Sequence, residues 1–209
     1  MNSGLFTRRH FNLKKVSGIC TVGVLIIGGL AISFGQQNNS ASESIVQRGL
    51  AIAPVPLNLH GKNRALVGTG SYLVNGVALC NNCHTSPSYL DNPFVGDPGT
   101  INTAGYMAGG ASFGPVVKSR NLTPDALGRP AGLSFSDFKN IMRTGLDDDA
   151  APPNIPSASH DLLQTMPWPV YRNMTDDDLR AIYEYLSAIP CIATDEGPEG
   201  EPPAHSCTP

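Results

Sequence analysis

The stretch Cys80-Asn81-Asn82-Cys83-His84 decides how the rest of the chain is interpreted. Two cysteines separated by two residues and followed at once by a histidine form the attachment motif of a c-type haem. Two thiols at this spacing can reach the two vinyl groups on one edge of a haem, and the adjacent histidine can bind the iron through an imidazole nitrogen. The motif therefore predicts one covalent haem c, attached to Cys80 and Cys83, with His84 as an iron ligand.

A Cys-x-x-Cys pair can also be a thioredoxin-like dithiol or half of a zinc site. The dithiol needs a βαβ setting, which the sequence pattern does not show. The zinc site needs a second ligand pair, and the other cysteines, Cys20, Cys191 and Cys207, lack this spacing. In an oxidising compartment we expect Cys191 and Cys207 to form a disulfide.

The chain of 209 residues is poor in charge and rich in loop formers, with 15% charged residues, 22 Gly and 18 Pro. This composition suits one small domain whose core is partly filled by a haem. Four of the 14 basic residues and none of the 17 acidic residues lie in residues 1–34, so the remainder is net negative. An acidic body argues against nucleic acid as a partner. Such a surface suits docking to a basic patch on a redox protein, but solubility alone is the simpler interpretation of dispersed acidic residues.

Residues 1–34 are predicted to be an export signal or a membrane anchor. A basic stretch over residues 7–15 precedes an apolar run from Val16 to Phe34, which is long enough as a helix to span a bilayer. The small residues of Ala31-Ile32-Ser33 also suit a cleaved signal peptide. The basic stretch contains a twin arginine, but haem c is attached to an unfolded exported chain, which favours general secretion. Either way, we expect the body on the periplasmic side of the bacterial cytoplasmic membrane.

The first helix of the body is predicted over Lys62–Leu79, where apolar residues recur at helical spacing. Gly68 and Gly70 are poor helix formers, and we expect them where another helix crosses closely. The helix would deliver the attachment motif at its C-terminal end. The Gly- and Pro-rich loop over Thr85–Lys118, with a small hairpin, is expected to wrap the haem edge.

Two more helices are predicted from capping residues. One begins at Ser134 or Ser136 and ends at Thr144, with Gly145 as its C-cap. The other begins after the N-cap Thr175, and a proline ends it. Its predicted apolar face consists of Leu179, Ile182, Tyr183, Leu186 and Ile189. The three acids Asp147-Asp148-Asp149 are interpreted as a solvated loop rather than a cation site.

The haem iron needs a second ligand opposite His84, usually a methionine thioether or another histidine. Met166 is favoured because Pro167 and Pro169 stiffen the loop that carries it. Trp168 can cover the haem edge and exclude water.

Other side chains remain candidates for this position. Met107, in a glycine-rich loop, and His160 stay open as alternatives. Met142 is more simply part of a core, and Met174 can pack beside a helix cap. His60 and His205 are expected in mobile segments.

The chain from about Leu66 to Pro190 resembles the class I c-type cytochromes. The resemblance rests on three stretches: Tyr72-Leu73-Val74 before Cys80–Thr85, Asn121-Leu122-Thr123-Pro124-Asp125, and Met166-Pro167-Trp168 through Tyr171-Arg172-Asn173-Met174-Thr175. More narrowly, the chain resembles the single-haem modules in cytochrome subunits of bacterial membrane-bound alcohol and aldehyde dehydrogenases. Those subunits usually carry three haems, whereas this chain has one motif.

The resemblance implies an all-α fold whose first and last helices cross beside the haem, with His84 and Met166 as axial ligands. The residues themselves predict an export signal or anchor (1–34) and a polar linker (35–61, with a short helical turn over Ile45–Ile52), ahead of a cytochrome c domain (62–190) and a C-terminal tail (191–209).

The implied function is that of an electron-transfer protein rather than an enzyme. It would carry single electrons between a dehydrogenase, an oxidase or another cytochrome, as a separate carrier or as a subunit of a dehydrogenase complex. One alternative is a haem enzyme with an open or labile sixth position, either peroxidase-like or oxidising a small sulfur compound. A gas sensor is a third class.

Overall fold

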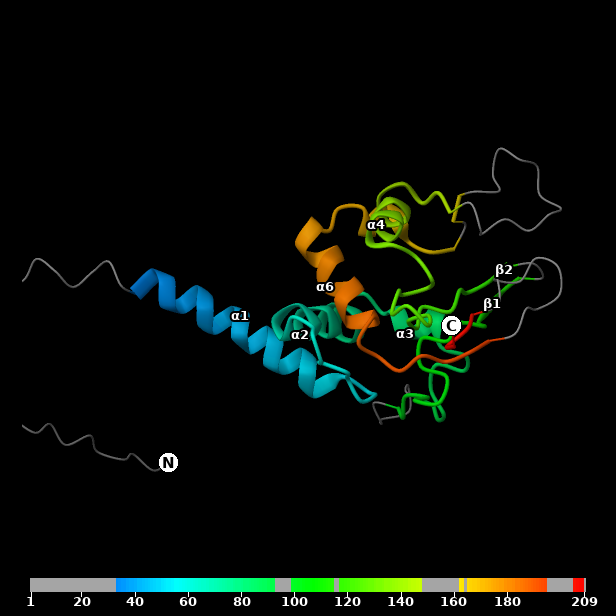
Figure 1. Ribbon diagram of the computed structural model, residues 1–209, viewed down its shortest axis with the longest axis horizontal. Helices are drawn as coiled ribbons and strands as arrows, with labels where there is room; N and C mark the ends of the chain where they lie inside the picture. Colours follow the sequence, from blue (N-terminus) through cyan, green and yellow to red (C-terminus); the bar gives the residue numbers. More distant parts are fainter. Residues whose placement is uncertain are drawn as a thin grey trace, which may run out of the picture.

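The computed structural model describes residues 33–92, 99–114, 117–147, 162–163, 165–194 and 205–208 (Figure 1). Within these residues the chain is mostly helical and has no sheet core, as predicted for an all-α protein. The helices are α1 (Ser33–Ile52), α2 (Arg64–Tyr72), the π-helix η1 (Leu73–Val77), α3 (Cys80–His84), α4 (Phe135–Thr144), α5 (Trp168–Tyr171) and α6 (Asp176–Leu186). The strands β1 (Ser112–Phe113) and β2 (Val117–Lys118) pair antiparallel in the predicted hairpin.

Helix α1 occupies much of the stretch where we expected a polar linker. It runs alongside α2 (Figure 1), and Val46 is almost completely buried in their contact. A Cβ atom on Gly68 would lie 2.7 Å from the carbonyl oxygen of Val46, and one on Gly49 would overlap the carbonyl group of Gly68. These two glycines allow the helix backbones to approach closely. The contact lies within Ile45–Ile52, where the sequence predicts a short helical turn, and α1 extends that turn toward the N-terminus into the expected linker.

Most of the predicted signal or anchor, residues 1–32, lies outside the described part of the chain. Among the residues that are described, no helix combines the length and the apolar character needed to cross a membrane.

Helices α2 and α6 pack against each other at the centre of the fold. A Cβ atom on Gly70 would overlap the carbonyl group of Ala181. The expectation that Gly68 and Gly70 mark close helix approaches is therefore confirmed, each glycine facing a different helix.

The capping residues of α4 and α6 act as predicted. Thr175 and Asp178 form a capping box at the start of α6, and Ser134 accepts a hydrogen bond from the Asp137 backbone at the start of α4. Gly145 ends α4 in the left-handed conformation (φ 73°), and its N–H donates to the Ile141 carbonyl.

The predicted apolar face of α6 packs against the core. The buried residues of this face are Leu179, Ile182, Leu186 and Ile189. Tyr183 is partly buried, with the rings of Phe135 and Phe138 edge-on to its own. Tyr185, which is not part of the predicted face, is completely buried as well.

A buried hydroxyl network joins the long loop after the motif to the central helices. The Tyr106 hydroxyl donates to Asn75 Oδ1 at 2.5 Å and lies 2.9 Å from the Tyr185 hydroxyl, which accepts from Asn75 Nδ2 at 3.1 Å. Burial raises the pKa of the Tyr106 hydroxyl far above its ordinary value, so it remains a protonated donor. Because each of these polar groups has a partner, the network fixes the loop without leaving an unsatisfied hydroxyl in the core.

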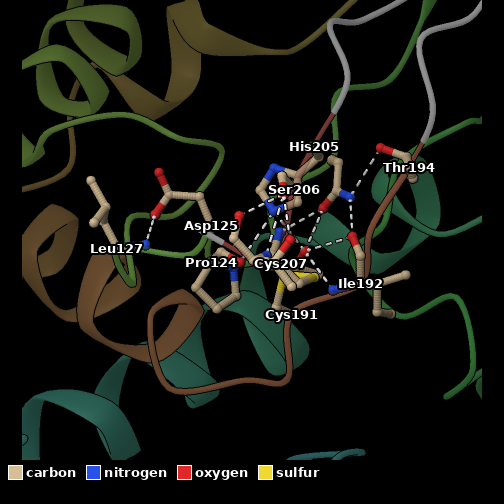
Figure 2. The surroundings of a disulfide bond; sticks show 12 residues. Pro124, Asp125, Leu127, Cys191, Ile192, Thr194, His205, Ser206 and Cys207 are labelled. Carbon is tan, nitrogen blue, oxygen red and sulfur yellow. Dashed lines mark hydrogen bonds between the residues drawn. A yellow bond between two sulfur atoms is a disulfide. The ribbon is translucent and has the colours of Figure 1, made fainter.

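The C-terminal tail is attached to the body, with the predicted disulfide joining Cys191 and Cys207 at a Cα–Cα distance of 5.7 Å (Figure 2). Thr194 and His205 exchange two backbone hydrogen bonds beside it. His205 is buried, so its expected placement in a mobile segment is wrong. The reason is the disulfide, which returns the chain end to the body.

Candidate haem site

The backbone changes conformation twice just before the attachment motif. The chain leaves α2 through the wider turn of η1, where the Ala78 N–H donates to the Leu73 carbonyl at 2.7 Å. Leu79 then adopts a positive φ of 56°, which is costly for a bulky residue, and α3 begins at Cys80. Strained backbone of this kind concentrates at functional sites. Here it turns the chain so that the motif forms a separate short helix.

The two motif cysteines are free thiols on one helical turn. Partial burial raises the pKa of the Cys80 thiol to about 12, the opposite of the lowered pKa that activates a thioredoxin-like cysteine. Cys191 and Cys207, which a zinc site could have recruited, are used by the disulfide. Both alternatives to haem attachment therefore lose support.

The orientation of His84 is fixed by one hydrogen bond. Its Nδ1 lies 2.9 Å from the carbonyl oxygen of Arg120. A carbonyl oxygen can only accept, so Nδ1 carries the proton and Nε2 keeps its lone pair. Burial lowers the pKa of the imidazole, which favours the neutral form. A neutral histidine held through one nitrogen presents the other as a metal ligand.

The segment that supplies the Arg120 carbonyl is itself held by the chain around the motif. The Gly109 N–H donates to the His84 carbonyl at 2.8 Å, and a Cβ atom on Gly109 would overlap the backbone of Ser119 and Arg120. The Arg120 guanidinium pairs with Asp147 at 3.2 Å, where both side chains are largely buried. Our interpretation of Asp147 as a solvated loop residue is wrong, because this arginine neutralises it; Asp148 and Asp149 lie outside the described residues.

Met166 lies half-buried against the hydrophobic core in residues 165–171, the Met166 segment, which ends with α5. The Tyr171 hydroxyl donates to the Ala78 carbonyl at 2.6 Å, so the end of this segment contacts the residue two before Cys80. At the other side, the Leu163 N–H donates to the Gly145 carbonyl at 2.8 Å. The structure thus anchors the Met166 segment both to the approach to the motif and to the end of α4.

The other ligand candidates differ among themselves in their environments. Met107 and Met142 are buried in the core, whereas Met174, like Met166, is partly buried against it, and the Met174 carbonyl accepts a hydrogen bond from Arg143. His60 is exposed, and His160 lies outside the described residues. The assignment of Met166 as the ligand opposite His84 stays a prediction.

The residues present fit a covalent haem. Two free thiols and an unprotonated Nε2 are the groups that haem c attachment requires. Several large apolar residues, between 36% and 67% exposed, lie just before the motif, within the Met166 segment or on the N-terminal side of that segment. They are Val77, Leu79, Leu146, Leu162 and Val170. An apolar macrocycle would shield such side chains from water.

The roles of Arg120 and Leu79 were not predicted from sequence. Arg120 directly precedes the Asn121–Asp125 stretch on which the family resemblance rests, so its position held a usable signal. A leucine with positive φ has no sequence signature, because the local propensity of leucine opposes that conformation.

Comparison with known proteins supports the resemblance. No protein-family model and no solved structure matches the chain. The cytochrome c subunit of a quinone alcohol dehydrogenase from Gluconobacter oxydans (strain 621H) is 32% identical over 141 residues, covering 65% of this chain and 25% of that protein. The gluconate 2-dehydrogenase cytochrome c subunit of Pantoea cypripedii is 28% identical over 124 residues, with 59% and 23% covered. The fructose dehydrogenase cytochrome subunit of Gluconobacter japonicus is 27% identical over 135 residues, with 64% and 22% covered.

The chain spans about a quarter of the length of these relatives. It resembles the cytochrome subunits of these dehydrogenases, as the sequence predicted.

Proposed function

We propose that the chain is a monohaem c-type cytochrome that carries single electrons outside the cytoplasm. The observation that carries this proposal is the hydrogen bond from His84 Nδ1 to the Arg120 carbonyl at 2.9 Å. It leaves Nε2 available on the residue next to two free thiols, which is the arrangement that covalent haem attachment needs.

The chain's own residues have distinct tasks in this proposal. Cys80 and Cys83 would hold the haem through thioether bonds to its two vinyl groups, so its retention would not rely on affinity. His84 binds the iron and keeps one orientation because the Arg120 carbonyl holds its other nitrogen. When bound, the haem accepts and releases one electron. The surrounding apolar side chains lower the local dielectric and exclude water, which tunes the potential.

We assign Met166 to the sixth position and place α2 and α6 beside the haem, as in class I cytochromes c. The support for Met166 is the Tyr171–Ala78 hydrogen bond, which ties its segment to the approach to the motif. A stable methionine ligand leaves no open coordination site, which favours electron transfer over an enzyme of the peroxidase type.

The named relatives suggest the class of partner. Each is the cytochrome subunit of a dehydrogenase, so we propose that this chain exchanges electrons with a dehydrogenase and a further redox protein. The apolar run over Val16–Phe34 would act as export signal or anchor and place the haem domain on the periplasmic side of the membrane.

The test is expression of the chain together with a haem-attachment system. Denaturing gel electrophoresis with haem staining, and the pyridine haemochrome spectrum, should show one covalent haem per chain. The double variant Cys80→Ser and Cys83→Ser should lack it, whereas Cys191→Ser with Cys207→Ser should keep it. A wild-type chain without covalent haem refutes the proposal.

A further inference from the structure

The C-terminal tail makes a hydrogen-bonded contact with the segment that follows Arg120. We call this structure the clip: residues 191–194 and 205–207, closed by the Cys191–Cys207 disulfide (Figure 2). Thr194 and His205 pair through two backbone hydrogen bonds at 3.0 and 2.9 Å. The described part of the clip therefore consists of one antiparallel bridge beside the disulfide.

Two buried side chains join the clip to the body. Asn121 Nδ2 donates to the Ile192 carbonyl at 2.8 Å, and the Ile192 N–H donates to Thr123 Oγ1 at 3.1 Å. The Thr123 hydroxyl in turn donates to Asn121 Oδ1 at 2.7 Å, which closes the link. Thr123 is completely buried and Asn121 is 4% exposed, so these bonds are shielded from competing water.

The second half of the clip holds the next two residues. His205 Nε2 lies 3.1 Å from the Pro124 carbonyl oxygen, which can only accept, so Nε2 is the donor of this hydrogen bond. The Ala126 N–H donates to the Ser206 carbonyl at 3.1 Å. Both halves of the clip are thus hydrogen-bonded to residues 121–126, which directly follow Arg120, the residue whose carbonyl orients His84.

We propose that the clip positions the Arg120 carbonyl against His84, which makes Asn121 and Thr123 positioning residues of the haem site. The inference rests on the proposed function, because it assigns the clip a role toward a bound haem. Upstream of Arg120 the chain is held at the hairpin base, where the Ser119 N–H donates to the Ala111 carbonyl at 2.9 Å. Downstream of Arg120 the chain is held by the clip. A carbonyl oxygen fixed in position keeps its hydrogen bond to His84 Nδ1, and this bond makes the imidazole a stronger base. A more basic imidazole would stabilise ferric relative to ferrous iron.

The test compares two threonine-to-valine variants of the haem-loaded protein. Thr123→Val keeps the side-chain shape and removes the hydroxyl that receives the Ile192 N–H. Thr175→Val is the matched control, because it also removes a threonine hydroxyl with backbone and side-chain partners, but at the start of α6. Haem content is first measured by pyridine haemochrome in both variants and in the wild type.

The readouts are the hydrogen-exchange rate of the His84 Nδ1 proton, measured by NMR on the reduced protein, and the midpoint potential. We expect Thr123→Val to speed exchange about tenfold, the equivalent of weakening one hydrogen bond, and to shift the potential upward. Thr175→Val should lower the unfolding temperature and leave both readouts unchanged. The double variant Cys191→Ser with Cys207→Ser should also speed exchange of the His84 Nδ1 proton and raise the midpoint potential. If Thr123→Val does not fold, the same comparison is made with this double variant.

Unchanged exchange in a haem-loaded Thr123→Val protein would overturn the inference and leave the proposed function standing. Equal changes in Thr123→Val and Thr175→Val would overturn it too, because general loss of stability would then explain them. A wild-type chain without covalent haem would refute both proposals together.

Discussion

Gly70 of α2 lies directly against the carbonyl group of Ala181 in α6, with no room for a Cβ atom between them. This contact sets how closely the two central helices approach, and the buried side chains Val67 and Leu179 lie in the same core. The distance between α2 and α6 is therefore determined by the absence of a side chain at Gly70 as much as by the apolar side chains around it.

Replacing Gly70 with alanine should destabilise the protein by roughly 3 kcal/mol, because backbone atoms cannot move aside as a flexible side chain would. Denaturant unfolding of the haem-loaded protein measures the loss. The matched control is Gly76→Ala, where the nearest atoms to a new Cβ lie at an ordinary contact distance of 3.5 Å. Equal stability of the two variants would contradict the close contact at Gly70.

Replacing Met166 with alanine should leave covalent haem content unchanged and remove the far-red absorption band of ferric methionine–haem coordination. The midpoint potential should fall by on the order of 0.1 V, because the thioether ligand stabilises ferrous iron. Met174→Ala is the control, since Met174 is also partly buried beside the core. Loss of the band in Met174→Ala and its retention in Met166→Ala would reassign the ligand.

Stability should fall in acid partly because of Asp125. Burial acts to raise the pKa of this carboxyl, but hydrogen bonds from the Arg129 side chain and from the backbone N–H groups of Arg129 and Leu127 outweigh it and hold the pKa below its ordinary value. The stabilisation is complete above the unfolded pKa of about 3.9 and is lost as pH falls through the lower folded pKa.

The measurement is the unfolding free energy of wild type and Asp125→Asn as a function of pH. The difference between them should be largest near neutral pH and shrink below about pH 4, where the wild-type carboxylate becomes protonated. Leu127→Ala, in the same turn with a side chain 72% exposed, should follow the wild-type profile. A pH-independent difference for Asp125→Asn would argue against a carboxylate role.

Removing the disulfide by Cys191→Ser with Cys207→Ser should lower the unfolding free energy by roughly 3 kcal/mol, the chain-entropy value for a loop of this length. Unfolding with and without a thiol reductant checks this on the wild-type protein as well. If the reductant leaves wild-type stability unchanged while mass spectrometry shows both thiols free, the disulfide adds no stability.

Several features follow from sequence for physical reasons that are local. Helix α4 begins and ends where Ser134 and Gly145 predict, because capping depends on a residue and its near neighbours. The disulfide follows from cysteine counting, because Cys191 and Cys207 are the pair left after the motif and the apolar N-terminal run are set aside. Gly70 signals a helix contact because no local reason explains a glycine at that position.

Other features depend on distant partners and escape a sequence pattern. The order of α1 depends on burial against Gly68, and the burial of Asp147 depends on Arg120. The orientation of His84 depends on a backbone carbonyl, which every residue possesses and no sequence marks. Local patterns therefore predict helices and motifs, whereas the groups that orient the side chains of the motif are found only from tertiary contacts.

The packing of α2 against α6 also affects the order of haem attachment and folding. The attachment motif follows α2 directly, whereas α6 lies far downstream in the sequence. A chain that is exported from its N-terminal end therefore exposes both thiols before α6 can pack against α2 and complete the core. We expect haem attachment to act on this open chain, with the arrival of α6 completing the fold around the product. A chain ending just before Thr175 should then acquire haem and yet unfold without cooperativity, which separates the chemistry of attachment from the closure of the core.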